Sequence, residues 1–132
     1  MSDEVCRVWL RRARSNLTRA ELGRQQEDIL YEDLCFDAQQ AAEKALKGLM
    51  AYFKIKIPRT HSIGYLLKII TRSRKVEVPK KLREAAVLTD YAVTTRYPGD
   101  WESLCKQDYE QAVSLAGEIY HWACSVTNEK AP

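Results

Sequence analysis

The stretch DAQQAAEKALKGL, residues 37–49, has the spacing of a helix that packs closely against its neighbours. Its small apolar residues Ala38, Ala42 and Ala45 recur at steps of four and three, and Leu49 continues the same line. Small side chains allow the axes of two helices to approach closely, as ridge-into-groove packing requires. The stretch therefore predicts a central helix of a helical bundle, over about residues 29–53.

A second pattern on the same helix places polar residues among apolar ones at heptad spacing. Its members are Phe36, Gln39, Glu43, Leu46, Met50 and Phe53. Because a seven-residue repeat is typical of a seam between helices, we expect this face to lie between two subunits, with Gln39 and Glu43 as a polar layer. Lys44 and Lys47 lie on the remaining side, where their partner is either solvent or a phosphate.

Length and composition are those of one soluble domain. The chain has 132 residues, a net charge of +3, 45% hydrophobic residues and 30% charged residues. We therefore expect a single domain over residues 1–132. No run approaches the ~20 apolar residues of a membrane span, and residues 1–14 lack the apolar centre of a signal peptide. The expected location is the cytoplasm.

Apolar residues at three- and four-residue steps predict five helices along the chain. They cover about residues 3–24, 29–53, 61–71, 80–93 and 103–126, with Thr60 as the N-cap of the short third helix. No stretch has the alternation of a strand. The expected fold class is all-α, an antiparallel up-down helical bundle of four long helices plus one short helix.

Three residues at helix ends and turns are candidates for binding an anion. His61 is expected in the first turn of the third helix, where backbone N–H groups favour negative charge. Arg96 and Tyr97 lie in the turn TTRYPGDW, where arginine would clamp a phosphate and tyrosine would stack on a base. The alternatives are an exposed His61, an Arg96 paired with Asp100 and a Tyr97 packed on the core.

The first helix has a basic face opposite its apolar stripe. Arg7, Arg11 and Arg14 share this face, and either solvent or a phosphate chain would be their partner. The second histidine, His121, lies on the polar side of the last helix, and we expect it to be solvated.

Several common kinds of site are missing from the sequence. Cys6, Cys35, Cys105 and Cys124 are far apart and form no CxxC, so we expect buried free thiols and no zinc site. There is no Walker loop and no GxGxxG, so side chains and helix ends would have to hold any nucleotide. We therefore assign no metal, no cofactor and no catalytic residue.

Taken in order, four segments resemble the HEPN domain family. They are WLRRARSNLTRAE, FDAQQAAEKALKGLM, PRTHSIGYLL and TRYPGDW, and they cover nearly the whole chain. The resemblance implies an all-α domain that is usually a homodimer. It also implies a nucleotide ligand or a minimal nucleotidyltransferase partner, as in a prokaryotic toxin–antitoxin pair.

Some relatives in that family are RNA-cleaving toxins, in which an arginine precedes a histidine with four to six residues between them. Before His61 those positions hold Lys54, Ile55 and Lys56, and before His121 they hold Ser114, Leu115 and Ala116. The nuclease motif is thus absent, and lysine lacks the planar fork of arginine. Three hypotheses follow: a nucleotide-binding accessory module, an endoribonuclease toxin, and a purely structural partner.

Overall fold

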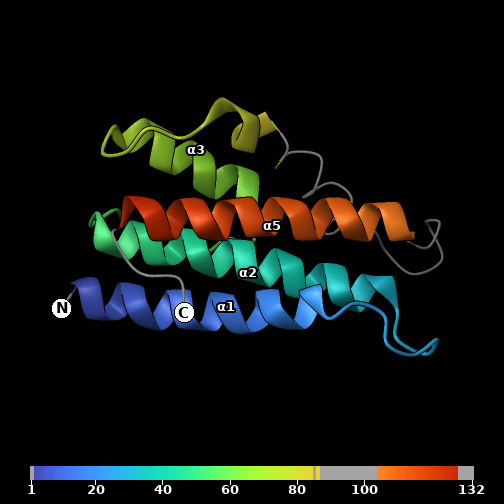
Figure 1. Cartoon of the computed structure of the whole chain (residues 1–132). Helices are drawn as coiled ribbons and strands as arrows, with labels where there is room; N and C mark the ends of the chain where they lie inside the picture. Colours follow the sequence, from blue (N-terminus) through green and yellow to red (C-terminus); the bar gives the residue numbers. More distant parts are fainter. Residues whose placement is uncertain (1, 85, 87–103, 128–132) are drawn as a thin grey trace.

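The computed structural model describes residues 2–84, 86 and 104–127, and this part of the chain is helical with no strand. The helices are α1 (Ser2–Glu21), α2 (Tyr31–Tyr52), α3 (Ile63–Ser73) and α5 (Lys106–Val126), and residues 80–84 and 86 are also helical. Helix α2 is central, because it contacts α1, α3 and α5 (Figure 1). The expected all-α bundle is confirmed. No helix in the described residues is long and apolar enough to cross a membrane.

The directions of the helices follow from the residues that meet between them. Asn16 and Arg19 of α1 contact Lys44 and Asp37 of α2 in reverse order, so these two helices are antiparallel. Helix α5 also runs opposite to α1, since Ala20 meets Tyr109 and Arg14 meets Tyr120. Helices α2 and α5 therefore run in the same direction (Figure 1).

Helix α3 also runs alongside α2 in the same direction. Its beginning lies beside the middle of α2, where His61 contacts Glu43. The residues after its end lie beside the C-terminus of α2, where Lys75 donates to the carbonyl of Phe53. The connection between the two helices, residues 53–62, must therefore return along α2.

That return begins at a sharp stop of α2. The amide of Ile55 bonds to the carbonyl of Met50 at 2.8 Å, and the amide of Lys54 bonds to that of Ala51 at 3.3 Å. These two bonds form a Schellman cap, and Lys54 takes the left-handed conformation (φ 58°) that this cap requires. Pro58 then prevents the connection from continuing as a helix.

The start of α3 differs from the sequence expectation. Ser62 is the N-cap, because its hydroxyl accepts from the amide of Tyr65 at 3.1 Å. Thr60 instead accepts from the amide of Ser62 at 3.1 Å, so the assignment of Thr60 as the N-cap was wrong. His61 consequently lies before the helix and not in its first turn.

The other described boundaries lie close to their predicted positions. Helix α1 ends at Glu21, short of the predicted residue 24, because Gly23 takes a left-handed conformation (φ 78°). Helix α5 begins at Lys106, after an N-cap at Cys105. Most of the predicted helix over residues 80–93 lies outside the described residues.

Small residues of α2 are buried against its neighbours, as the opening stretch predicted, since Ala38, Ala42 and Ala45 are at most 3% exposed. The contact between α2 and α1 includes Gly48. At Gly48, a Cβ would lie 3.0 Å from Cβ of Trp9 and 3.3 Å from the carbonyl oxygen of Cys6. The two helices thus approach so closely at this point that only glycine fits without a shift.

We predict that Gly48→Val destabilises the fold by about 1–3 kcal/mol, because a branched side chain must displace the backbone of α1. Urea denaturation followed by circular dichroism measures the loss. Gly117→Val is the matched control, since a Cβ there meets nothing within 4 Å. Equal losses in the two variants would contradict close contact at Gly48.

Candidate functional site

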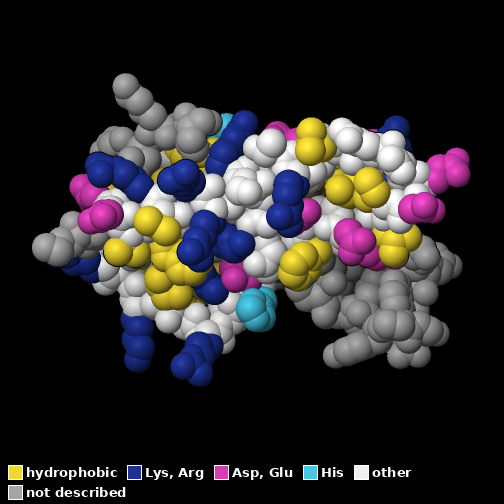
Figure 2. Space-filling model, turned by 90° about the horizontal axis from the view of Figure 1, so that it is seen from below, with side chains coloured by type: hydrophobic (Ala, Val, Ile, Leu, Met, Phe, Trp, Pro, Cys, Tyr) yellow, Lys and Arg dark blue, Asp and Glu magenta, His cyan; other side chains and the backbone are white. Residues whose placement is uncertain are grey.

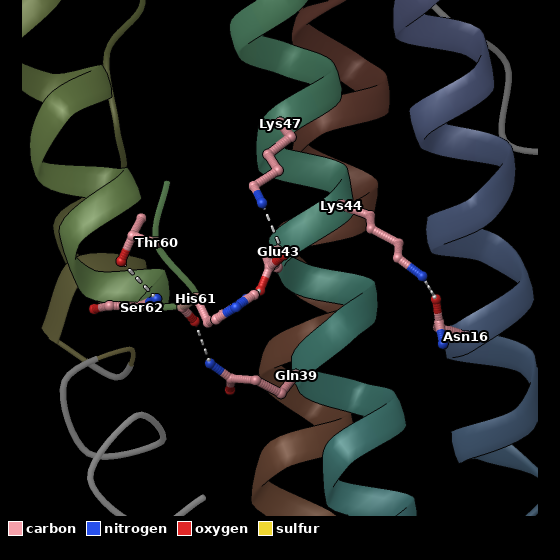
Figure 3. Close-up of polar contacts among 8 residues, drawn as sticks. All are labelled: Asn16, Gln39, Glu43, Lys44, Lys47, Thr60, His61 and Ser62. Carbon is pink, nitrogen blue, oxygen red and sulfur yellow. Dashed lines mark hydrogen bonds and ion pairs between the residues drawn. The ribbon is translucent and has the colours of Figure 1, made fainter. Parts of the chain in front are cut away.

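A buried carboxylate on α2 is the centre of the candidate site (Figure 3). The side chain of Glu43 is only 5% exposed, yet both of its oxygens are bonded. Oε2 lies 2.9 Å from Nζ of Lys47, one turn further along α2, and Oε1 lies 3.0 Å from Nδ1 of His61. Because a buried charge is costly unless it is paired, these two partners explain how the carboxylate is tolerated in the bundle.

His61 is held from two sides by α2. Its ring contacts Glu43, and its backbone carbonyl accepts a hydrogen bond from Nε2 of Gln39 at 3.3 Å. Gln39 and Glu43 are one turn apart and therefore point the same way from the helix. Ser62, the next residue, is fixed as the cap of α3. The position of the imidazole is thus determined by two adjacent turns of α2.

The imidazole itself is largely in solvent, with 82% of its side chain exposed. When Nδ1 carries the proton, it donates to the Glu43 carboxylate, and Nε2 is left to accept a proton or a hydrogen bond. When both nitrogens are protonated, Nε2 becomes a donor for an anion. A carboxylate that orients an exposed histidine in this way is an arrangement suited to proton transfer or to phosphate binding.

Lys47 does not lie free at the surface, where the sequence placed it. Its side chain is 13% exposed, and Nζ lies 5.8 Å from the centre of the Trp9 ring as well as beside Glu43. It therefore neutralises the buried carboxylate, and a protonated His61 would be the excess positive charge at this place.

Lys44 belongs to a second polar group, between α1 and α2. Its Nζ donates to Oδ1 of Asn16 at 2.7 Å, and the Asn16 amide donates to Asp37 at 3.2 Å. Arg19 also binds the Asp37 carboxylate. The buried Asn16 is thus satisfied by two side chains of α2, and Lys44 links α1 to α2 instead of facing outward.

The predicted seam between subunits is mostly buried inside one chain. Leu46 and Met50 are fully buried, while Gln39 and Glu43 are 3% and 4% exposed and meet His61. The heptad pattern on these residues therefore reflects packing within the chain. The two ends of the pattern differ, since Phe36 is 57% exposed and Phe53 is half-buried.

The remaining candidates have diverse surroundings. Arg96 and Tyr97 lie outside the described residues. Arg7 and Arg11 are exposed, whereas Arg14 lies 3.8 Å from Glu21 and over the ring of Tyr120. His121 is exposed, as expected (both histidines are visible in Figure 2). No group of three possible metal ligands occurs among the described residues.

The cysteines are free thiols, and three of the four are buried. Burial raises the pKa of Cys35 to about 11, with smaller contributions from Asp108 and Glu32. This thiol stays protonated at neutral pH and is a poor nucleophile. Cys105 is the exception to the expected burial, because it is exposed as the N-cap of α5.

Comparison with known proteins agrees with this architecture. The family model for the HEPN domain matches residues 6–129. The chain belongs to the HEPN domain family. Two solved structures resemble this HEPN domain over almost their whole length. TT1696 from Thermus thermophilus is 37% identical, with 91% of this chain and 96% of that chain covered and a TM-score of 0.74. ST0689, an archaeal HEPN homologue, is 27% identical, with 92% and 97% covered and a TM-score of 0.71. No curated protein matches significantly.

For Glu43→Ala we predict a loss of about 3 kcal/mol in the free energy of unfolding, because Lys47 would be left in a buried place without its counter-charge. The double variant Glu43→Ala/Lys47→Met should recover part of this loss. Glu118→Ala, which removes an exposed partner of Lys81, is the control and should change stability by less than about 0.5 kcal/mol. Chemical denaturation of all four proteins makes the comparison. A Glu43→Ala variant as stable as the control would contradict the proposed pairing.

Proposed function

We propose that this HEPN domain is a nucleotide-binding accessory module in which His61 contacts a phosphate of the ligand. The observation that carries the proposal is the exposed imidazole bonded to the buried Glu43. A solvated histidine needs no buried carboxylate to support it, and an apolar residue at position 43 would pack in the core at lower cost. The arrangement therefore favours a role for a fixed imidazole at the surface.

The charges around His61 suit an anionic ligand. Glu43 pairs with both Lys47 and His61, so a single carboxylate is shared by two basic groups. The exposed Arg59 lies two residues before His61 and adds to the positive potential. Charge-assisted hydrogen bonds from such groups are the usual contacts to phosphate oxygens.

A second function, RNA cleavage, is favoured by one feature of the same site. A histidine oriented by a carboxylate is the arrangement of a general base, and a metal-independent ribonuclease needs such a base. Against it stands the absence of an arginine at the nuclease spacing before His61. Lysines occupy two of those positions, and both Lys54, just after α2, and Lys56 are exposed. We therefore place nucleotide binding first.

Titration calorimetry at low salt with ATP, GTP and a short RNA tests both functions. We expect wild type to bind a nucleotide, and we expect His61→Ala to weaken binding about tenfold, as the loss of one charge-assisted hydrogen bond predicts. His121→Ala is the matched control and should bind as wild type does. No binding of any of the three ligands would reject the ligand site. RNA that is cleaved by wild type but not by His61→Ala would favour the ribonuclease instead.

The proposal includes a homodimer and a minimal nucleotidyltransferase partner. Both come from the family resemblance, and the exposed aromatic ring of Phe36 on α2 supports a protein contact there.

We predict that wild type is a dimer and that the Phe36→Asp variant is a monomer. The variant should keep its thermal stability, because Phe36 is exposed in the single chain. Met50→Glu, in contrast, should unfold the protein, because it places a carboxylate in the core. Light scattering and thermal melting separate the two effects. A wild-type protein that is already monomeric at all concentrations would reject the homodimer.

A further inference from the structure

The basic residues of this protein are concentrated in one segment, residues 54–83. Of the 21 lysines and arginines in the chain, 10 fall in this segment, together with one of the 18 acidic residues. The segment therefore carries a charge of +9, while the rest of the chain carries −6. The overall charge of +3 hides this division. We refer to residues 54–83, which include α3, as the basic lobe.

All ten basic side chains of the lobe are exposed; they are Lys54, Lys56, Arg59, Lys68, Arg72, Arg74, Lys75, Lys80, Lys81 and Arg83. Three of them have partners: Lys75 binds backbone carbonyls at the end of α2, Lys80 lies 3.8 Å from Glu84, and Lys81 lies 3.4 Å from Glu118. The other seven form no ion pair within the described residues. No ion pair among the described residues therefore relieves their mutual repulsion.

The surface between these charges is nearly free of large apolar side chains. Tyr65 is the one large hydrophobic residue of the described lobe that is exposed, at 46%. Protein interfaces have apolar centres and are depleted in lysine, and attachment to a bilayer needs apolar side chains that insert. Interfaces with nucleic acids are instead polar and strongly positive. In Figure 2, Lys and Arg side chains at the lower left of the view project beyond the surface around them.

We propose that the basic lobe binds the phosphodiester backbone of a nucleic acid without regard to base sequence. On α3, Tyr65, Lys68 and Arg72 follow each other at steps of three and four and so share one face, where the ring offers a base a surface for stacking. The lobe carries charges on α3, on the turn after it and on the helical residues 80–83. This spread of charges is wider than one mononucleotide needs. This inference does not depend on the proposed role of His61.

The test is fluorescence polarisation with a labelled oligouridylate and with an RNA duplex, over a series of KCl concentrations. The triple variant Lys68→Gln/Arg72→Gln/Arg74→Gln should bind at least about tenfold more weakly, and the slope of log K against log[KCl] should fall by about two, as the loss of three phosphate contacts predicts. Arg12→Gln/Arg24→Gln/Lys106→Gln removes the same charge from exposed positions outside the lobe and should bind as wild type does. Circular dichroism confirms that all variants are folded.

Three results would overturn the proposal. One is the absence of binding to either RNA at low salt, and another is an equal loss in the two triple variants, which would indicate only net charge. The third is equally tight binding of polyglutamate through the lobe, which would indicate an acidic protein. His61→Ala should keep its affinity for RNA while its affinity for nucleotide falls about tenfold, so failure of the nucleotide site and failure of the lobe give different results.

Discussion

The close contact between α1 and α2 is the constraint on which the rest of the structure depends. The absence of a side chain at Gly48 allows the two axes to come close together. This closeness places Trp9 of α1 over the ammonium group of Lys47 and brings Asn16 within reach of Lys44. The two lysines are consequently engaged by neighbours and do not face outward.

Apolar periodicity was enough to predict which segments are helical, because burial against a neighbour requires apolar side chains at helical spacing. It also identified Gln39 and Glu43 as members of a buried face. It did not identify which segment covers that face. The spacing of apolar residues shows to which side of the helix axis a residue points, but not which part of the protein packs there. The partner is the connection before α3, whose return along α2 depends on a cap at Lys54 and on Pro58.

The lysines and the helix start show a similar limit. Lys44 and Lys47 were expected to face outward, but their acceptors lie on α1 and on the heptad face. A helical wheel does not include a neighbouring helix. Thr60 and Ser62 are both good capping residues, and only the path of the backbone selects Ser62. Cys105 was expected to be buried because its apolar neighbours suggested it, whereas it ends up as an exposed cap.

The pairing of Glu43 with a lysine four residues later has a consequence for the order of folding. Contacts within one helix form quickly and require no loop closure, whereas the contact with His61 must wait until the connection has returned along α2. The carboxylate can therefore meet its first counter-charge while α2 is still surrounded by water. The carboxylate is already neutralised when the bundle closes over it. Burying it therefore costs less free energy than burying an unpaired charge would.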